Sequence, residues 1–480
     1  MKTNKNKKHI SRPHNKTKKY KKSITPLKIY NVTHEGVPLE IQIQQLQINE
    51  LNRTPTPVAC PISNLHRRKR GGWQNIRLSG TPYQIGYQHG TLLSKQLQKV
   101  IDIFPIYVKN ELNQSYESFM TNCMQIIKPI LQEKYPDIYE ELQGISDGSE
   151  ENGTPISIDL LIAWNSQMSI TQNTQCKGQR CSAFIATGNR TKTGEIIMSH
   201  NTHSDYLSGQ LFNIIFHITP NKGTEFIMQS APGLIWSMTD WFICKSGIIG
   251  CESTNYTNQF DPHFGTPIFC RIRQAMQYAK NIDEFTQTLL YDNAGDYPCS
   301  WLLGDTKTNE IALFELGKSI YSLERTDNGI YYTMNSPHNT ILRQNETRNP
   351  NEYNNIKSSS GSRNHRFQNI FQSYDKLDIP IAKKIISDHY DPFLKKENPG
   401  YRTICKHNEI SKQKKYYPFG TCDAKITTTE LAKQMQFIAK WGPPCNQTFN
   451  SKQFIHKHPK YQYLEPYLED FKKELWTTIF

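Results

Sequence analysis

The stretch Cys-Ser-Ala-Phe-Ile-Ala-Thr-Gly at residues 181–188, followed by Glu-Ile-Ile-Met-Ser-His-Asn-Thr at residues 195–202, decides the type of fold that we expect. Both segments have the composition of strands, and the glycine-containing turn between them predicts that they pair as neighbours. The preceding sequence differs, because apolar residues recur there at helical spacing, most clearly over residues 83–104. The chain therefore changes from helices to strands at Cys181.

Further strand-like runs follow, beginning with residues 211–220. Helical patterns cover residues 267–290 and 428–440, and the Asp-Asn-Gly triplet at residues 327–329 predicts a tight hairpin turn. Helices, then antiparallel-looking strands, then helices predict an α+β protein. Strands that are apolar on both faces predict a sheet that is covered on both sides.

The chain divides into three expected parts. Residues 1–70 form a basic tail and linker, residues 71–180 a helical fragment, and residues 181–480 a strand-rich fragment, with 71–480 as one structural domain. The formal net charge is +14, and residues 1–28 hold ten Lys and one Arg without an acid. Such a tail cannot form a core, so we expect it to be disordered. Nonspecific contact with nucleic acid or an anionic surface fits this tail, and a solvated tail without a dedicated partner fits equally well.

The cysteines and apolar runs limit the class of protein. Eleven Cys occur without a CxxC pair or a zinc-type Cys/His spacing, so we expect no metal, no cofactor and mostly reduced thiols. No run approaches the roughly 20 apolar residues of a membrane helix, and the amino terminus lacks a secretory signal. These patterns predict an intracellular protein without a membrane span.

Cys181 is the candidate nucleophile. A thiol needs a base or a lowered pKa before it attacks an acyl bond. If the chain were cut before Cys181, the new α-amino group, whose pKa is typically about 7.7–8.0, would supply that base within the same residue. The local pattern alone also fits an ordinary buried thiol at the start of a strand.

Several segments in order resemble one family. These are residues 80–90 (GTPYQIGYQHG), 181–188, 199–202 (SHNT), 291–317 (YDNAGDYPCSWLLGDTKTNEIALFELG) and 421–445 (TCDAKITTTELAKQMQFIAKWGPPC). Together they resemble the acyl-coenzyme A:6-aminopenicillanic-acid acyltransferases and their cysteine-peptidase-like relatives. Phospholipase-B-like proteins and the linear amide C–N hydrolases, such as bile-salt and penicillin-V hydrolases, are more distant relatives. The resemblance covers about residues 72–480 and leaves the basic tail unexplained.

The resemblance implies the Ntn-hydrolase fold, an αββα four-layer sandwich of two antiparallel sheets between helices. It also implies autocatalytic cleavage between Arg180 and Cys181, with Cys181 as nucleophile and its α-amine as base. Asn293 matches the asparagine that helps to hold the oxyanion. Asn201 matches a polar residue near the nucleophile, although a strand-end Asn that caps a turn fits as well. Arg363 is the match for an arginine of the acyltransferases.

Other residues compete for these roles. Arg366 is an alternative to Arg363, because a polar insertion precedes both. The acyltransferases carry an aspartate shortly after the asparagine matched to Asn201, and here His203 or Asp205 takes its place, or the role is absent. Three further candidates are weaker. His89 fits a packed core residue, His200 fits a Cys–His pair less well than the Ntn arrangement does, and Cys299 fits a core thiol.

Two functional hypotheses follow. In the first, the protein is an autoprocessing amide hydrolase or acyltransferase that works through an acyl-enzyme thioester on an acyl-amide or acyl-thioester substrate. In the second, it is an inactive Ntn scaffold whose basic tail binds nucleic acid or a surface. The presence of Cys181, Asn201 and Asn293, all chemically competent, favours the enzyme.

Overall fold

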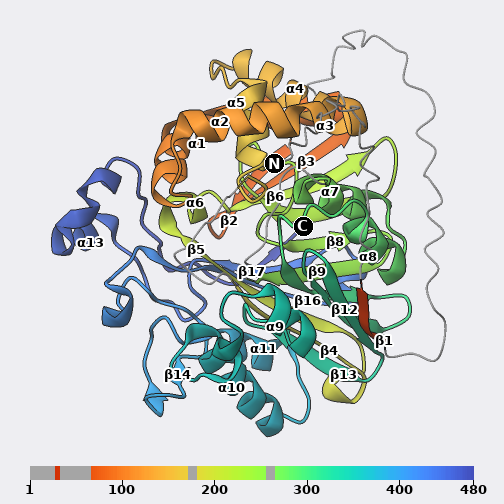
Figure 1. Ribbon diagram of the computed structural model, residues 1–480, viewed down its shortest axis with the longest axis vertical. Helices are drawn as coiled ribbons and strands as arrows, with labels where there is room; N and C mark the ends of the chain where they lie inside the picture. Colours follow the sequence, from red (N-terminus) through yellow and green to blue (C-terminus); the bar gives the residue numbers. More distant parts are fainter. Residues whose placement is uncertain (1–27, 33–65, 171–180, 256–264) are drawn as a thin grey trace, which may run out of the picture.

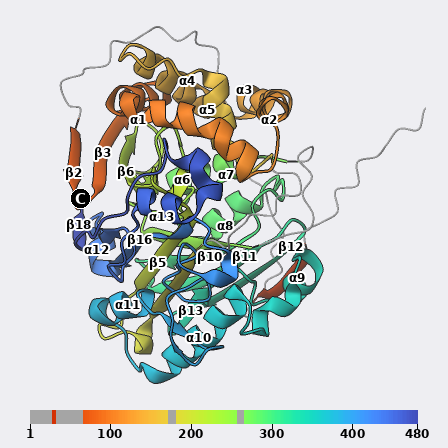
Figure 2. The same ribbon diagram turned by 90° about the vertical axis from the view of Figure 1, so that its left-hand side faces the viewer.

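The computed structural model describes residues 28–32, 66–170, 181–255 and 265–480. Their backbone forms two stacked sheets, with helices against the outer face of each (Figure 1). Seen from the side, α1 to α5 lie at one end of the molecule and α10 and α11 at the other, with the sheets between them (Figure 2). The mixed α and β composition expected from the sequence is confirmed.

The larger sheet has ten strands in the order β1-β12-β11-β10-β9-β8-β7-β6-β3-β2. Neighbours pair antiparallel, except that β1 pairs with β12 and β3 with β6 in parallel. The strands are β1 (Lys28–Val32), β2 (His66–Arg70), β3 (Trp73–Gly80), β6 (Ile214–Pro220), β7 (Phe226–Ser230), β8 (Trp241–Cys244), β9 (Ile248–Thr254), β10 (Cys299–Asp305), β11 (Glu310–Leu316) and β12 (Ile320–Thr326).

The smaller sheet has six antiparallel strands in the order β13-β4-β5-β16-β17-β18. They are β4 (Ser182–Thr187), β5 (Ile197–Asp205), β13 (Gly329–Thr333), β16 (Phe419–Thr428), β17 (Phe437–Trp441) and β18 (Thr477–Ile479). As expected, the strand that follows Cys181 pairs with the strand that carries Asn201, with Ser182 opposite Asn201. A separate two-stranded hairpin joins β14 (Tyr390–Asp391) to β15 (Lys396–Glu397).

Helices cover the outer face of the larger sheet. His89 of α1 packs on Phe216 of β6, and Phe285 of α8 stacks on Phe242 of β8, so both helices lie on the same face. The helices on this side are α1 (Pro82–Asn110), α2 (Tyr116–Asn122), α3 (Lys128–Lys134), α4 (Pro136–Glu150), α5 (Ile158–Asn165), α7 (Ile268–Tyr278) and α8 (Ile282–Leu290), with a π-helical turn at Cys123–Ile127.

The outer face of the smaller sheet packs against α10 and α11. Phe184 and Ala186 of β4 share a core cluster there with Phe367 and Phe371 of α10. The remaining helices are α6 (Tyr206–Gly209), α9 (Thr340–Glu346), α10 (Ser359–Ser373), α11 (Ile379–Ile386), α12 (Thr429–Lys433) and α13 (Ser451–Lys457), with short 3-10 turns at Gly188–Arg190, Pro350–Asn354, Lys412–Lys414 and Pro459–Leu464.

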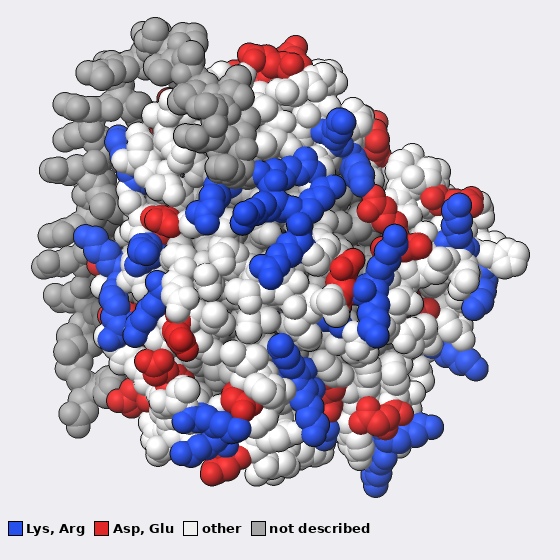
Figure 3. Space-filling view, turned by 180° about the vertical axis from the view of Figure 1, so that it is seen from behind, with Lys and Arg blue, Asp and Glu red and all other residues white. Residues whose placement is uncertain are grey.

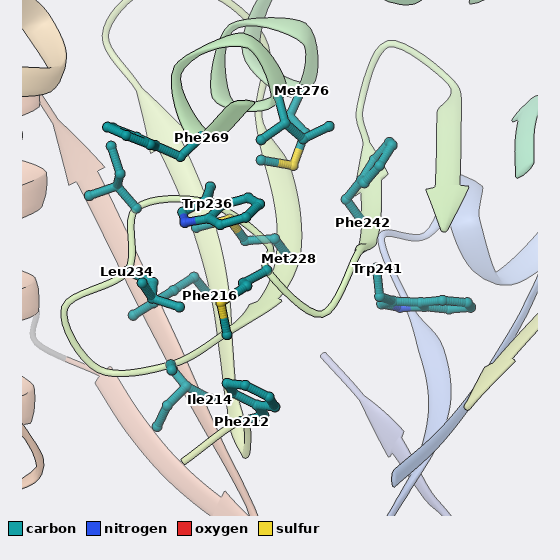
Figure 4. Close-up of a cluster of buried hydrophobic side chains, with 14 of the residues drawn as sticks. Phe212, Ile214, Phe216, Met228, Leu234, Trp236, Trp241, Phe242, Phe269 and Met276 are labelled. Atoms are coloured by element: carbon teal, nitrogen blue, oxygen red, sulfur yellow. The ribbon is translucent and has the colours of Figure 1, made fainter. Parts of the chain in front are cut away.

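The main core fills the space under the first helical layer and between the sheets. Figure 4 shows one part of it, where Phe216 and Met228 of neighbouring strands meet Phe269 and Met276 of α7, with Trp236 between them. Burial of such large side chains stabilises the fold by about 1.5–3 kcal/mol each. This core fixes the loop at residues 231–240, which leads into the candidate site.

Close packing of α1 on α4 depends on glycine. A Cβ atom at Gly86 would lie 1.9 Å from the carbonyl oxygen of Glu141, and one at Gly144 would lie 2.2 Å from that of Tyr83. Real Cβ atoms do not approach backbone so closely, so the two helices could not keep this separation with larger residues. A Cβ atom at Gly90 would likewise lie 2.2 Å from the carbonyl oxygen of Ile145, so the contact explains Gly86 and Gly90 of residues 80–90, one of the segments that carried the family resemblance.

Three predicted elements differ from the structure. The segment 71–180 is mostly helical but opens with β3, which joins the larger sheet. The turn at residues 327–329 makes no hairpin, because β12 belongs to the larger sheet and β13 to the smaller one. The helix expected over 428–440 is only α12, and the chain then returns as β17 alongside β16.

The expected tail of residues 1–70 contains two segments of the larger sheet. β1 and β2 form its opposite edges, so the boundary at residue 70 is wrong for these strands. Arg68, Lys69 and Arg70 of β2 are exposed, and charged side chains on an edge strand oppose unwanted strand pairing.

Residues 1–27 lie outside the described residues, and with them nearly all of the segment expected to touch nucleic acid. On the face shown in Figure 3, Lys and Arg gather in the upper middle, with acidic side chains interspersed below. Among the described residues, no helix is both long and apolar enough to cross a bilayer.

Candidate active site

Cys181 stands immediately before β4 and is only 3% exposed. Its φ angle is +68°, in the left-handed region that non-glycine residues seldom adopt. Such a conformation costs on the order of 1–3 kcal/mol and persists where surrounding contacts enforce it. The chain is therefore strained at the residue where cleavage is expected. Arg180, on the other side of the expected cleavage point, lies outside the described residues.

Arg363 is the side chain that holds this strained residue. It is fully buried in α10, and its Nη1 donates to the carbonyl oxygen of Cys181 at 2.6 Å and to Ser182 Oγ at 2.9 Å. Its Nη2 donates to Asn335 Oδ1 at 2.9 Å, and its Nε to the carbonyl oxygen of Ser359 at 3.1 Å. Charged hydrogen bonds of this kind are the strong ones in protein interiors. The arginine expected from the resemblance is thus placed against the candidate nucleophile.

Asn335 links Cys181 to the larger sheet. It follows β13, is 3% exposed, and adopts a φ of +73°. Its backbone N–H donates to Ser253 Oγ at 3.2 Å, and its Nδ2 donates to the carbonyl oxygen of Thr254 at 2.8 Å. The end of β9 and the start of β4 are therefore connected through the pair Arg363 and Asn335.

A pair of buried carboxyls lies beside Cys181, where β8 begins and β9 ends. Tyr297 Oη bridges them, 2.8 Å from Asp240 Oδ2 and 2.7 Å from Glu252 Oε1. Burial, the charge of Glu252 and a hydrogen bond between the two carboxyls raise the pKa of Asp240 well above its ordinary value, and the nearby Cys181 thiol adds to this rise. Two carboxyls this close resist ionising together. The site therefore disfavours a second negative charge beside the candidate nucleophile.

The side chain of Asn201 faces the helical layer outside the smaller sheet. Side chains alternate along a strand, and directly paired residues face the same way. Ser182 contacts Arg363 in the helical layer, so its partner Asn201 faces that layer too. Its Nδ2 donates to the carbonyl oxygens of Ile386 and Ile404 at 2.7 and 3.3 Å. The structure places Asn201 as a support for the segment that follows α11.

The side chain of Asn293 bonds to backbone groups of its own loop and of the turn between β11 and β12. Its Nδ2 donates to the carbonyl oxygens of Gly317 and Lys318 at 2.8 and 3.4 Å, and its Oδ1 accepts from Gly295 N at 2.9 Å. These bonds hold the loop between α8 and β10. The expected oxyanion role of Asn293 stays a prediction.

The residues named as alternatives in the sequence analysis also bond to partners other than Cys181. Arg366 pairs with Asp388 at 2.6 Å, which leaves Arg363 as the arginine at Cys181. His203 contacts the carbonyl oxygen of Ile404 at 3.1 Å, and Asp205 caps α6 through Ser208 N at 2.8 Å. Neither residue supplies an acid beside the nucleophile.

The remaining candidates are buried residues with structural contacts. His89 Nε2 accepts from Gly233 N at 2.9 Å, and burial together with Arg273 lowers its pKa to about 3. His89 is therefore a packed core residue, as expected. His200 Nε2 lies 3.0 Å from the carbonyl oxygen of Glu252, and burial holds its pKa well below the usual value. Cys299 is fully buried, and burial raises its pKa, as befits a core thiol.

The sequence did not indicate Asn335, Asp240 or Glu252. A signal was present for Asp240 and Glu252, because each is a carboxylate in or beside a largely apolar strand. Nor did the sequence indicate a cluster of two His and two Cys near β14, described below, which could hold a metal ion.

Comparison with known proteins gives matches to phospholipase B proteins. A family model described as Phospholipase B matches residues 141–321, a range that contains Cys181, Asp240 and Glu252. The chain is 27% identical over 277 residues to Phospholipase-B 81 of Drysdalia coronoides, covering 51% of this chain and 47% of that protein. It is 23% identical over 324 residues to Phospholipase B-like protein C of Dictyostelium discoideum, covering 58% and 56%.

An acyltransferase also matches, over a shorter range. The acyl-coenzyme A:6-aminopenicillanic-acid-acyltransferase 40 kDa form of Emericella nidulans is 24% identical over 82 residues, or 17% of this chain and 23% of that protein. The broader similarity is thus to phospholipase B-like proteins, which reverses the order that the sequence motifs suggested. The chain spans about half the length of the phospholipase B relatives that it matches.

Proposed function

We propose that this protein is an autoprocessing acyl hydrolase or acyltransferase of the Ntn-hydrolase type, with Cys181 as its nucleophile. The observation that carries the proposal is the Arg363 side chain, which reaches the Cys181 carbonyl oxygen and Asn335 from a fully buried position. Two stacked sheets between helical layers agree with the αββα arrangement of that fold. The matched relatives, phospholipase B-like proteins and an acyltransferase, support acyl chemistry.

Processing comes first in this mechanism. The Cys181 thiol attacks the carbonyl carbon of Arg180, the peptide nitrogen of Cys181 leaves as an amine, and a thioester forms. Water then hydrolyses the thioester, which frees the Arg180 carboxylate, the Cys181 thiol and a new α-amino group. The left-handed conformation of Cys181 supports this step, because strain stored in the uncut chain is released on cleavage.

Turnover uses the same thiol. The α-amine accepts the thiol proton, the thiolate attacks the acyl carbonyl of the substrate, and the leaving group takes the proton back. Water or another acceptor then breaks the thioester. A base held within the same residue as the nucleophile needs no separate positioning.

Asn335 takes the oxyanion role in this proposal, in place of Asn293. Its side chain is fixed by Arg363 and Thr254 next to the Cys181 backbone, and a neutral amide donor stabilises developing charge without quenching a thiolate. The raised pKa of Asp240 limits the negative charge beside the thiol. Arg363 acts as a positioning residue, because it contacts the backbone of Cys181.

The substrate class is an acyl amide, an acyl thioester or a lipid acyl ester. The names of the relatives favour lipids, and the cysteine nucleophile suits all three. The expected intracellular location stays a prediction. The second hypothesis, an inactive scaffold with a basic tail, is the outcome to be excluded.

A trapping experiment tests the proposal. The purified full chain is incubated with lysophospholipids, N-acyl amides and acyl thioesters, quenched in acid, and its mass is measured. We expect an acyl adduct on Cys181, together with release of the leaving group. The variant Cys181→Ala should form no adduct, whereas Cys244→Ala, which removes a buried thiol at the far end of β8, should form it as the wild type does.

Two results would overturn the assignment. An adduct that persists in Cys181→Ala would move the nucleophile elsewhere. No turnover with any of the three substrate classes, combined with tail-dependent binding to nucleic acid or anionic vesicles, would favour the scaffold.

A further inference from the structure

Four side chains of metal-binding type meet at a place that the proposed acyl chemistry does not use. They are His389, Cys405, His407 and Cys445, and one ligand atom from each lies within 4.8 Å of the others. Cys405 and His407 are fully buried, and the other two are partly buried. The group therefore sits inside the protein, where polar atoms need partners.

The distances fit a single tetrahedral ion. His407 Nε2 lies 3.4 Å from Cys405 Sγ and 3.4 Å from Cys445 Sγ. With zinc–sulfur and zinc–nitrogen bonds of about 2.3 and 2.0–2.1 Å, tetrahedral angles place sulfur and nitrogen ligands about 3.6 Å apart. The Nε2 atom of His389 is buried, and no residue of the part of the chain that the structure describes bonds to it.

Surrounding groups orient the ligands. His407 Nδ1 lies 2.8 Å from Glu409 Oε1, and that carboxylate is itself buried. A carboxylate on the far nitrogen fixes the tautomer in which Nε2 faces the sulfurs, as is usual for histidines that bind metal. Gln447 N donates to Cys445 Sγ at 3.4 Å, a bond that favours a thiolate.

From this geometry we infer a structural zinc site with His389, Cys405, His407 and Cys445 as its ligands. Two thiolates and two imidazoles form a standard closed zinc site, in which four protein ligands leave no position for a substrate. On binding, the two thiols lose their protons to water and the ion carries no redox chemistry. The expectation of no metal rested on local spacing, whereas these ligands come from three separate segments.

The site joins those segments to the helix that serves Cys181. His389, Cys405 and His407 belong to the stretch between α11 and β16, and Cys445 follows β17. In the same stretch the carbonyl oxygen of Tyr401 accepts from Ser359 Oγ at 2.7 Å, and Ser359 begins α10, which carries Arg363. Asn201 holds the other side of the stretch through Ile386 and Ile404. The ion thus connects the segment that follows α11 to the segment that follows β17, behind the candidate site.

Metal content and cobalt spectroscopy test the inference on the full chain, purified under reducing conditions. We expect one zinc ion per wild-type chain by inductively coupled plasma mass spectrometry. Cys445→Ser, at the least buried sulfur, should lose most of it, and His389→Asn should do the same. Cys244→Ser, with a buried thiol outside the cluster, is the matched control and should keep it. Replacement by Co²⁺ should give a thiolate charge-transfer absorption that Cys445→Ser abolishes.

Chelation supplies a measurement independent of the variants. Removing the ion with a zinc chelator should lower the melting temperature, and ZnCl2 but not MgCl2 should restore it. Zinc-free protein with an unchanged melting temperature after ZnCl2 addition would overturn the inference. So would a Cys405–Cys445 disulfide in peptide mapping of freshly isolated protein, or equal zinc content in wild type and Cys445→Ser.

Discussion

Arg363→Met is the substitution that most directly probes how the site is built. The guanidinium donates hydrogen bonds to the carbonyl oxygens of Cys181 and Ser359, to Ser182 Oγ and to Asn335 Oδ1. Methionine fills a similar volume but leaves these buried acceptors without their donor. An unsatisfied buried group costs about 1–3 kcal/mol, and relaxation recovers part of the sum, so we expect the free energy of unfolding to fall by at least about 3 kcal/mol.

The matched control is Arg366→Met, one turn further along α10. Arg366 pairs with Asp388, and the two side chains are 24% and 13% exposed, so its loss should cost about 1 kcal/mol or less. Urea unfolding of both variants gives the two energies. Turnover measured where both remain folded separates positioning from stability, because Arg363→Met should be inactive and Arg366→Met near wild type. Equal losses of stability and activity in the two variants would refute the reasoning.

Three further predictions test other parts of the account. Gly86→Ala should destabilise the fold by about 1–3 kcal/mol in urea unfolding, because its Cβ would lie 1.9 Å from the Glu141 carbonyl oxygen; an unchanged midpoint would contradict the close helix contact. Asp240 has a raised pKa, so its stabilising contribution is full below its ordinary value of 3.8 and is lost as pH rises through the folded value. Asp240→Asn should therefore lose less stability than wild type between acid and neutral pH, and parallel pH profiles would count against the raised pKa of Asp240. Asn335→Ala should lower kcat about 10²–10³-fold, as expected for an oxyanion donor, whereas Asn293→Ala should leave kcat near wild type; the reverse order would restore the original assignment.

Much of the architecture was predictable from local pattern. The strands beginning at residues 182 and 197 and the long helix α1 were expected, because their apolar periodicity is strong. The helix predicted over residues 428–440 was wrong because β16 offers hydrogen-bond partners to β17, which no local propensity can reveal. Met435 adopts a φ of +54° between α12 and β17, where the chain reverses.

The candidate site was predictable in part. Cys181 was expected from its chemistry and Arg363 from the family resemblance, and Arg363 donates to the carbonyl oxygen of Cys181. The choice between Asn293 and Asn335 as the oxyanion donor depends on which strand ends meet in space, and local sequence does not reveal that. The metal ligands were missed for the same reason, since their convergence depends on the pairing of β16 with its neighbours.

The central claim is that Cys181 becomes an amino terminus and acts as the nucleophile, and the masses and terminal sequences of the purified protein test it most directly. Cleavage between Arg180 and Cys181 predicts fragments of 180 and 300 residues from the 480-residue chain, the second beginning Cys-Ser-Ala-Phe. Cys181→Ser should cut slowly, because a hydroxyl is a weaker nucleophile with a higher pKa. Cys181→Ala should remain one folded, inactive chain. An uncut wild-type chain that still turns over acyl substrates, or full activity in Cys181→Ala, would contradict the account.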